Sequence, residues 1–277
     1  MGEEPTKKEL TVFAPRKKKI FLEYPKEFFV EEATKLVKLA DERGIPLRIL
    51  GALAIYIHSP EEGRKLHDKF GRKFSDIDLI TTGKREDVKE FFTGIGYIPR
   101  ERMMVIMEEA RHIYLHPEKQ DLHVDIFFDE LNMCHRIDFR KRISVDYPTI
   151  SLADLVLEKL QIVHINEKDI MDLITLFRYH EVGESDKDEI NAKYIAKLLA
   201  NDWGFWYTAT NNLRRLRDEF LEKYSPDVLT EEDVKVVKEK VDALMDYVEK
   251  EPKSMKWKLR AKIGPKVKWY QEVDEIW

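Results

Sequence analysis

The chain has 277 residues, 43% of them hydrophobic, so it has the length and apolar content for one large globular domain or two smaller ones. Its formal net charge of −5 excludes a general basic field that recruits nucleic acid, although a local basic patch stays open. The single Cys134 excludes an internal disulfide and a cysteine-based zinc cluster. Residues 1–19 do not resemble a signal peptide, and no apolar run approaches the roughly 20 residues that span a bilayer. We therefore expect a cytoplasmic protein with no membrane partner.

The N-terminal part of the chain predicts an alternation of helices and strands. Apolar residues recur at helical spacing from Phe29 to Ala40, and Gly44 with Pro46 ends that helix. A short apolar run then predicts a strand that turns at Gly51 directly into a helix. The predicted elements of this part are a charged arm at 1–20, a helix at 29–40, strands at 47–50 and 75–80, a helix at 84–93, and strands at 103–107, 111–116 and 122–128.

The second half of the chain is predicted to be mostly helical. Ser151 and Asp154 have the spacing of a capping box, and Asn166 opens another helix in the same manner. Thr230 and Asp233 cap a long helix further along. Together the elements predict an α/β (α+β) fold in three parts, which are an N-terminal arm at 1–20, a core at 21–183 and a mostly helical C-terminal region at 184–277.

Three aspartates in short apolar runs carry most of the functional information. Asp76 and Asp78 are two residues apart in a predicted strand, so they project to the same face, and Asp125 lies in a later predicted strand. Adjacent ionised carboxylates in an apolar strand repel each other and are costly to desolvate, and a bound divalent cation would remove that cost. The pattern therefore indicates a protein that handles a metal and, through it, a phosphate.

Nucleotidyl transfer requires these same residue types. Two Mg²⁺ ions roughly 3.5–4 Å apart can neutralise the transferred phosphate and the leaving oxygen, and can lower the pKa of the attacking hydroxyl. We expect Asp76 and Asp78 to bridge such metals to a triphosphate, with Mn²⁺ as the alternative ion. Asp125 would hold the second metal and orient the acceptor hydroxyl as its general base. The turn at Gly51 would bring backbone N–H groups at a helix N-terminus against the phosphates.

Three segments resemble the nucleotidyltransferase superfamily that includes DNA polymerase β, and these are Gly51-Ala52-Leu53-Ala54, Ser75-Asp76-Ile77-Asp78 and Val124-Asp125-Ile126. Two later segments, 154–161 and 168–173, resemble a narrower branch that contains the abortive-infection toxin nucleotidyltransferases. The resemblance covers roughly residues 45–180. It implies a mixed β-sheet flanked by helices, Mg²⁺, an NTP substrate and transfer of a nucleoside monophosphate to a hydroxyl.

The resemblance also implies roles for single residues. Lys159 would contact the nucleotide phosphates, and either Asp169 or Asp172 would lie near the active cleft. The residues assigned to the nucleotide site are Gly51, Ala52, Ser75, Lys159 and Asp169. The chain departs from the family at Ala52, because members usually have Gly or Ser there. A Ser hydroxyl would bind phosphate, and Ala52 cannot make that bond.

Structural roles stay open for the residues of the later segments. Lys159 lies on a capped amphipathic helix and could be a solvated residue or could pair with the neighbours of Glu158. Lys168 and Asp172 have the spacing of an i, i+4 ion pair, and Asp169 at a helix N-terminus could stabilise the helix dipole.

A basic segment lies near the end of the chain. Residues 253–269 contain seven basic residues and no acidic one. Apolar and basic residues alternate from Met255 to Ile263, which predicts a strand with one apolar and one basic face. Together with its aromatic residues, the stretch Lys253–Lys268 could contact tRNA. The alternative is a terminal segment docked on the core through its aromatic residues, with its lysines solvated.

The sequence thus predicts a Mg²⁺-dependent nucleotidyltransferase that moves a nucleoside monophosphate from an NTP to an acceptor hydroxyl and releases pyrophosphate. The acceptor stays open among a protein, an RNA and a small molecule. One alternative is a nucleotide-binding or regulatory protein of the same fold that has no turnover. The other is a toxin-like module that acts on tRNA with an antitoxin partner.

Overall fold

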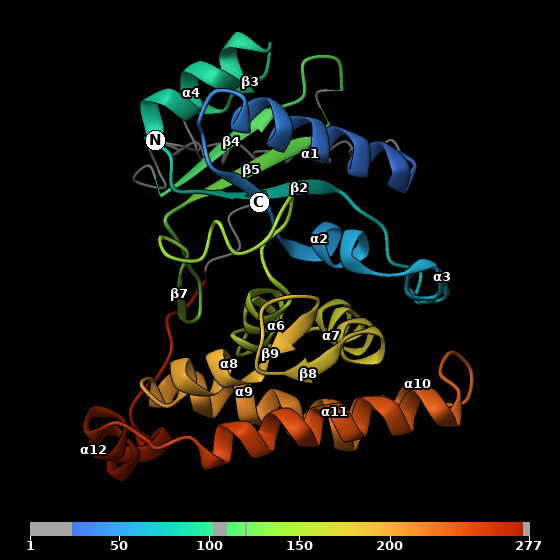
Figure 1. The fold of residues 1–277 in the computed structure, drawn as a ribbon, viewed down its shortest axis with the longest axis vertical. Helices are drawn as coiled ribbons and strands as arrows, with labels where there is room; N and C mark the ends of the chain where they lie inside the picture. Colours follow the sequence, from blue (N-terminus) through green and yellow to red (C-terminus); the bar gives the residue numbers. More distant parts are fainter. Residues whose placement is uncertain (1–23, 102–109, 120, 274–277) are drawn as a thin grey trace, which may run out of the picture.

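A five-stranded mixed sheet forms one end of the molecule, and a layer of helices forms the other (Figure 1). The computed structural model describes residues 24–101, 110–119 and 121–273. The predicted arm at 1–20 and the predicted strand at 103–107 lie outside these described residues. The fold class is α+β, as the element pattern predicts.

The main sheet has the strand order β1-β2-β5-β4-β3. Its strands are β1 (Leu47–Ile49), β2 (Asp76–Thr81), β3 (Ile98–Pro99), β4 (Arg111–Leu115) and β5 (His123–Phe128). The central strands β2 and β5 run parallel, whereas the other neighbours are antiparallel. A parallel pair needs a long crossover connection, and the segment between β2 and β5 supplies it with a helix and two further strands.

Helices pack on both faces of this sheet. The helices of the first half are α1 (Lys26–Asp41), α2 (Gly51–His58), α3 (Glu61–Lys69) and α4 (Arg85–Gly94). The apolar stripe of α1 is fully buried, and Gly44 with a φ of 71° lets the chain leave the helix, as predicted. Figure 1 shows α1 and α4 on one side of the sheet and α2 on the other, between the sheet and the helical layer.

The helical layer begins within the predicted core. Its helices are α6 (Leu152–Leu160), α7 (Glu167–Tyr179), α8 (Ala192–Leu199), α9 (Trp203–Arg215), α10 (Leu221–Tyr224), α11 (Glu231–Lys250) and α12 (Met255–Ile263), with a π-helical turn at Leu216–Phe220 and a 3₁₀ turn at Gly264–Lys266. Ser151, Asn166 and Thr230 each accept a hydrogen bond from the amide three residues later, as the predicted caps require. No described helix has the length and apolarity to cross a membrane.

Two small strand pairs complete the fold, β6 (Glu130–Asn132) with β7 (Arg136–Asp138), and β8 (Glu181–Gly183) with β9 (Glu189–Asn191). The predicted boundary at 183/184 falls between β8 and β9, which pair in parallel. The buried apolar residues on both sides of it form one continuous core cluster. The division into a core and a C-terminal region stays a prediction.

The prediction of a strand from Met255 to Ile263 is wrong, because this segment is the helix α12. Ser254 caps α12 by accepting a hydrogen bond from the Trp257 amide over 3.2 Å. Alternation along the sequence misled the prediction, because an apolar residue at every second position also gives a helix apolar residues four apart. Trp257 and Trp269 pack on α9, and the lysines of the segment other than Lys253 are exposed, in agreement with the alternative that the sequence left open.

Candidate active site

The three aspartates lie on one face of two neighbouring parallel strands. Asp78 on β2 is directly in register with Asp125 on β5, and Asp76 lies two residues before Asp78. The residues between them, Ile77 and Leu79, are fully buried on the opposite face. Strand alternation and the parallel pairing therefore bring all three carboxylates to the same side of the sheet.

Burial and mutual repulsion act on this carboxylate group. Burial raises the pKa of Asp78 well above its ordinary value, and the charges of Asp76 and Asp125 raise it further. Burial also raises the pKa of Asp125, although Arg111 opposes that shift. Arg111 Nη2 donates a hydrogen bond to Asp125 Oδ2. The other oxygen, Oδ1 of Asp125, is buried and has no hydrogen-bond partner among the residues that the structure describes.

The turn that joins β1 to α2 lies directly beside Asp78. Gly51 has a φ of 75°, and a Cβ at this position would meet Asp78 Oδ2 at 3.0 Å. Only glycine combines this backbone conformation with so close an approach. The preceding amide, that of Leu50, donates to the carbonyl of Asp78 over 3.0 Å. Gly51 therefore fixes the turn against the carboxylates.

The amide of Gly51, at the turn that is predicted to bring backbone N–H groups against the phosphates, has a partner within the chain. It donates to Glu158 Oε2 on α6 over 3.0 Å. Burial raises the pKa of Glu158, while Lys159 and the Gly51 amide act in the opposite direction. A buried carboxylate at this helix N-terminus thus occupies the place expected for a phosphate oxygen.

Lys159 is buried rather than solvated, and the surface alternative for it is wrong. Its Nζ lies 3.5 Å from Glu158 Oε1, 3.4 Å from Asp169 Oδ1 and 3.3 Å from Asp172 Oδ2. Burial acts to lower the pKa of Lys159, but these three carboxylates outweigh it, and the pKa lies above the ordinary value. The ammonium group therefore joins α6 to α7 as the centre of a buried ion cluster.

The partner of Asp172 is Arg72, which the sequence did not single out. Arg72 Nε and Nη2 donate to the two oxygens of Asp172, both over 2.9 Å. Burial acts to raise the pKa of Asp172, but Lys159, His67 and Arg72 reverse the shift and place it below the ordinary value. Asp169 lies in the first turn of α7, where its amide donates to Oδ1 of the N-cap residue Asn166 over 3.1 Å.

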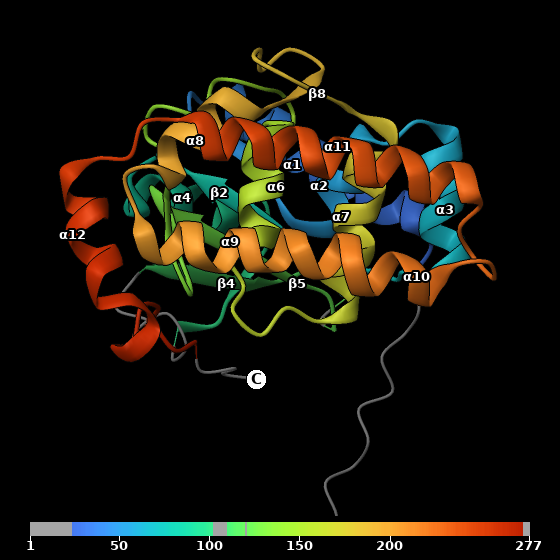
Figure 2. The same cartoon turned by 90° about the horizontal axis from the view of Figure 1, so that it is seen from below.

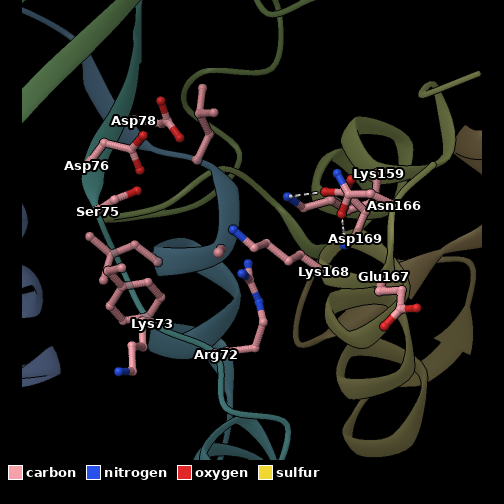
Figure 3. A pocket seen from close by; sticks show the side chains of 14 residues that line it. Arg72, Lys73, Ser75, Asp76, Asp78, Lys159, Asn166, Glu167, Lys168 and Asp169 are labelled. Atoms are coloured by element: carbon pink, nitrogen blue, oxygen red, sulfur yellow. Dashed lines mark hydrogen bonds and ion pairs between the residues drawn. The ribbon is translucent and has the colours of Figure 1, made fainter. Parts of the chain in front are cut away.

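A cavity of about 550 Å³ opens between these groups, within the range of about 300–1,000 Å³ that is typical for small-molecule sites. Its lining residues are Leu50, Ala52, Leu53, Arg72, Lys73, Phe74, Ser75, Asp76, Asp78, Lys159, Asn166, Glu167, Lys168 and Asp169. Figure 3 shows the carboxylates of Asp76 and Asp78 on one side and Lys168 reaching in from the start of α7. Besides Asp76 and Asp78, the charged residues of the lining are the cations Arg72, Lys73, Lys159 and Lys168 and the acids Glu167 and Asp169.

Six of the eight residues predicted for the nucleotide and metal site line this cavity, namely Ala52, Ser75, Asp76, Asp78, Lys159 and Asp169. Gly51 and Asp125 adjoin it through Asp78. Sequence reasoning missed Arg72, Arg111 and Glu158. A signal for Glu158 was present, because an acidic residue beside Lys159 in so apolar a helix requires a buried partner.

Two of the three aspartates, Asp76 and Asp78, suit a divalent cation. Asp76 and Asp78 offer the carboxylate oxygens that Mg²⁺ prefers, and the repulsion between them favours an added positive charge. At Asp125 the guanidinium of Arg111 already supplies that charge. Within residues 24–101, 110–119 and 121–273, no three acidic, histidine or cysteine side chains are already gathered closely enough to hold an ion.

No protein-family model and no curated protein sequence matches the chain. Among solved structures, a candidate nucleotidyltransferase from H. pylori has a TM-score of 0.41 and 12% identity, with 82% of this chain and 98% of that chain covered. JHP933 from Helicobacter pylori has a TM-score of 0.38 at 12% identity, covering 87% and 99%. The antibiotic-resistance factor ANT(2'')-Ia has a TM-score of 0.32 at 12% identity, covering 86% and 94%.

Proposed function

We propose that this chain is a metal-dependent nucleotidyltransferase, which moves a nucleoside monophosphate from an NTP to an acceptor hydroxyl. One observation carries the proposal: Asp76, Asp78 and Asp125 share a face of two parallel strands beside a cavity that four cationic side chains also line. Such a cavity matches a metal-bound triphosphate, whose cations need carboxylates and whose outer phosphates need cationic side chains.

In this reaction the acceptor oxygen attacks the α-phosphorus, a bond from that oxygen to phosphorus forms, and the bond to the bridging oxygen breaks as pyrophosphate leaves. When bound, Mg²⁺ neutralises charge on the transferred phosphate and lowers the pKa of the attacking hydroxyl. Asp76 and Asp78 are the residues that would hold it. Asp125, whose pKa is raised by burial, would take the hydroxyl proton.

The cationic residues of the cavity have two roles in this proposal. Lys168 is exposed at the start of α7 and lines the cavity, so it is placed to contact the β- and γ-phosphates. Lys159 is largely neutralised by its three carboxylate neighbours and acts as a positioning residue for the cavity floor. Arg72 has the same positioning role through Asp172.

A second candidate function is nucleotide binding without turnover. Two contacts favour it, because the Gly51 amide already donates to Glu158 and Asp125 already accepts a hydrogen bond from Arg111. Both groups would have to move for the proposed reaction. Ala52, which has no hydroxyl for a phosphate, also favours this candidate.

Titration calorimetry with a non-hydrolysable NTP tests the proposal at the binding step. Binding should require Mg²⁺ or Mn²⁺ and should weaken at least tenfold in Asp78→Asn. Asp87→Asn, an exposed aspartate on α4, is the matched control and should bind normally. Binding that ignores both the metal and the Asp78 substitution would contradict a metal-dependent site.

Transfer itself is tested by incubating the protein with each α-³²P-labelled NTP, Mg²⁺ and a total cell extract. Label that moves to a protein, an RNA or a small molecule identifies the acceptor class, and Asp78→Asn should abolish it. Metal-dependent NTP binding with no transfer to any acceptor would favour the second candidate.

A further inference from the structure

The helix α12 is held at the edge of the molecule by aromatic contacts on its inner side. Trp257 packs edge-to-face on Trp206 of α9, with ring centroids 5.0 Å apart. After the helix, Trp269 Nε1 donates to Thr208 Oγ1 over 3.0 Å. Figures 1 and 2 both show α12 at the end of the molecule opposite α3 and α10. Its inner side is therefore fixed, and its outer side faces away from the rest of the chain.

The outer side of α12 is a row of exposed apolar side chains. Met255, Leu259 and Ile263 are 71%, 57% and 49% exposed, and Val267 just beyond the helix is 57% exposed. Residues four apart on a helix differ by about 40°, so the three helical residues cover an arc of about 80°. We call this row, with Val267, the α12 surface. Such a patch on one helix marks an interaction site rather than scattered exposure.

Lysines border the α12 surface on both sides. By the same helical geometry, Lys258 and Lys262 lie along one edge of the apolar arc and Lys256 along the other, and all three are exposed. Residues 253–269 carry seven basic side chains and no acidic one, whereas the whole chain has a net charge of −5. The positive charge is thus concentrated around α12, the one helix among the described residues that carries exposed large apolar side chains.

We propose that the α12 surface docks on an anionic lipid surface. A helix with an exposed apolar row and flanking lysines lies in the plane of a membrane interface, with its apolar side chains in the acyl region and its ammonium groups among the phosphates. Long lysine side chains reach the headgroup level while their stems follow the apolar surface. This proposal is independent of the proposed nucleotidyl transfer, and it replaces the expectation of no membrane partner, which considered only spanning segments.

Two other occupants agree less well with the surface. Single-stranded RNA needs aromatic faces for base stacking, but Trp257 and Trp269 are engaged on α9, and the outward row is aliphatic. A second copy of this chain would bring two basic segments together, and like charges repel. An anionic bilayer supplies both partners of the surface at once, phosphates for the lysines and hydrocarbon for Met255, Leu259 and Ile263.

Vesicle sedimentation with the full chain tests the proposal. Vesicles of phosphatidylglycerol and phosphatidylcholine should bind the protein, whereas pure phosphatidylcholine vesicles should not, and 0.5 M NaCl should weaken binding to the anionic vesicles. Leu259→Ser should lower the partition ratio about tenfold, since burial of a leucine side chain is lost. Ile98→Ser, an exposed apolar residue on β3, is the matched control and should bind like the unchanged protein.

Insertion and folding are measured separately. Leu259→Trp places a fluorescent reporter on the α12 surface, and lipids brominated on the acyl chain should quench its added fluorescence, whereas the tryptophan fluorescence of Leu259→Ser should stay unchanged. Circular dichroism melting should give the same midpoint for Leu259→Ser and the unchanged protein, and Met255→Ser repeats the test at a second position. Absence of binding to anionic vesicles, binding equal in Leu259→Ser, or binding only to total tRNA would each overturn the proposal.

Discussion

Arg111 on β4 donates a hydrogen bond to Asp125 on β5, the buried carboxylate that stands in register with Asp78. The guanidinium also lies over the ring of Phe127, with its carbon 5.0 Å from the ring centroid. The chain therefore supplies its own cation next to the third carboxylate. In the proposed reaction this cation competes with a metal ion for Asp125.

Removing this internal cation should increase the effect of Mg²⁺ on stability. Arg111→Met leaves Asp125 buried without a charge partner, and the free energy of unfolding in metal-free buffer should fall by about 1–3 kcal/mol. Added Mg²⁺ should then stabilise the variant more than it stabilises the unchanged protein. Thermal melting with and without MgCl₂ measures both effects.

The matched control for this variant is Arg136→Met, because Arg136 pairs with Glu130 at the surface. Its stability should change by less than about 1 kcal/mol, and its response to Mg²⁺ should be that of the unchanged protein. An equal Mg²⁺ response in Arg111→Met and Arg136→Met would show that Arg111 does not compete for a metal site.

Neutralising Asp78 should stabilise the metal-free protein at neutral pH. The pKa of Asp78 is raised in the folded state by burial and by Asp76 and Asp125, so the folded state binds its proton more tightly than the unfolded state. Stability is then lost as pH rises from the ordinary aspartate pKa of about 4 through the raised value. Asp78→Asn removes the contribution of Asp78 to this slope, so the variant should be more stable than the unchanged protein at pH 7. Urea unfolding from about pH 4 to 8 measures it, and Asp87→Asn should leave the slope unchanged.

The regular elements of this chain were predictable because local signals and burial agree. The apolar stripe of α1 and the caps Ser151, Asn166 and Thr230 are short-range features, and the structure has them where the pattern places them. The common face of Asp76 and Asp78 follows from strand alternation alone. Its register with Asp125 also requires β2 and β5 to pair in parallel, which strand alternation does not specify.

Contacts across the fold were not predictable in the same way. Arg72 meets Asp172 from 100 residues away, and Gly51 meets Glu158 from 107 residues away. No spacing rule relates such pairs, since their distance is set by how α6 and α7 pack against α2. The error at α12 has a different cause. Apolar residues at every second position are compatible with a strand and also with a helix whose apolar row has basic side chains on both flanks.

Two lysines of the cavity should separate structural and binding roles. Lys159→Met removes the ammonium group that three buried carboxylates share and should cost about 3–5 kcal/mol of stability at pH 7. Lys168→Met removes an exposed side chain and should change stability by no more than about 0.5 kcal/mol, while NTP binding weakens. Urea unfolding and titration calorimetry measure the two properties. If Lys168→Met bound NTP normally, the phosphate role of Lys168 would be wrong.

The same cluster predicts a pH dependence for Lys159→Met. The pKa of Asp172 is held below its ordinary value in the folded state, so its contribution to stability is present above the unfolded pKa and is lost as pH falls. Without Lys159 this contribution is smaller. The stability difference between Lys159→Met and the unchanged protein should therefore shrink as the pH is lowered from 7 to about 3, and a difference that stays constant would contradict the ion cluster.

Two glycines with similar backbone angles allow the role of Gly51 to be isolated. Gly51 has a φ of 75° and Gly71 a φ of 66°, so an alanine at either position costs about 1–2 kcal/mol in backbone strain. A Cβ at Gly71 meets nothing within 4 Å, whereas a Cβ at Gly51 meets Asp78 Oδ2 at 3.0 Å. Gly51→Ala must therefore push the Asp78 carboxylate aside. Both variants should lose similar stability in thermal melting, but only Gly51→Ala should lose Mg²⁺-dependent NTP binding, and equal binding in the two variants would show that the turn does not position Asp78 for the metal.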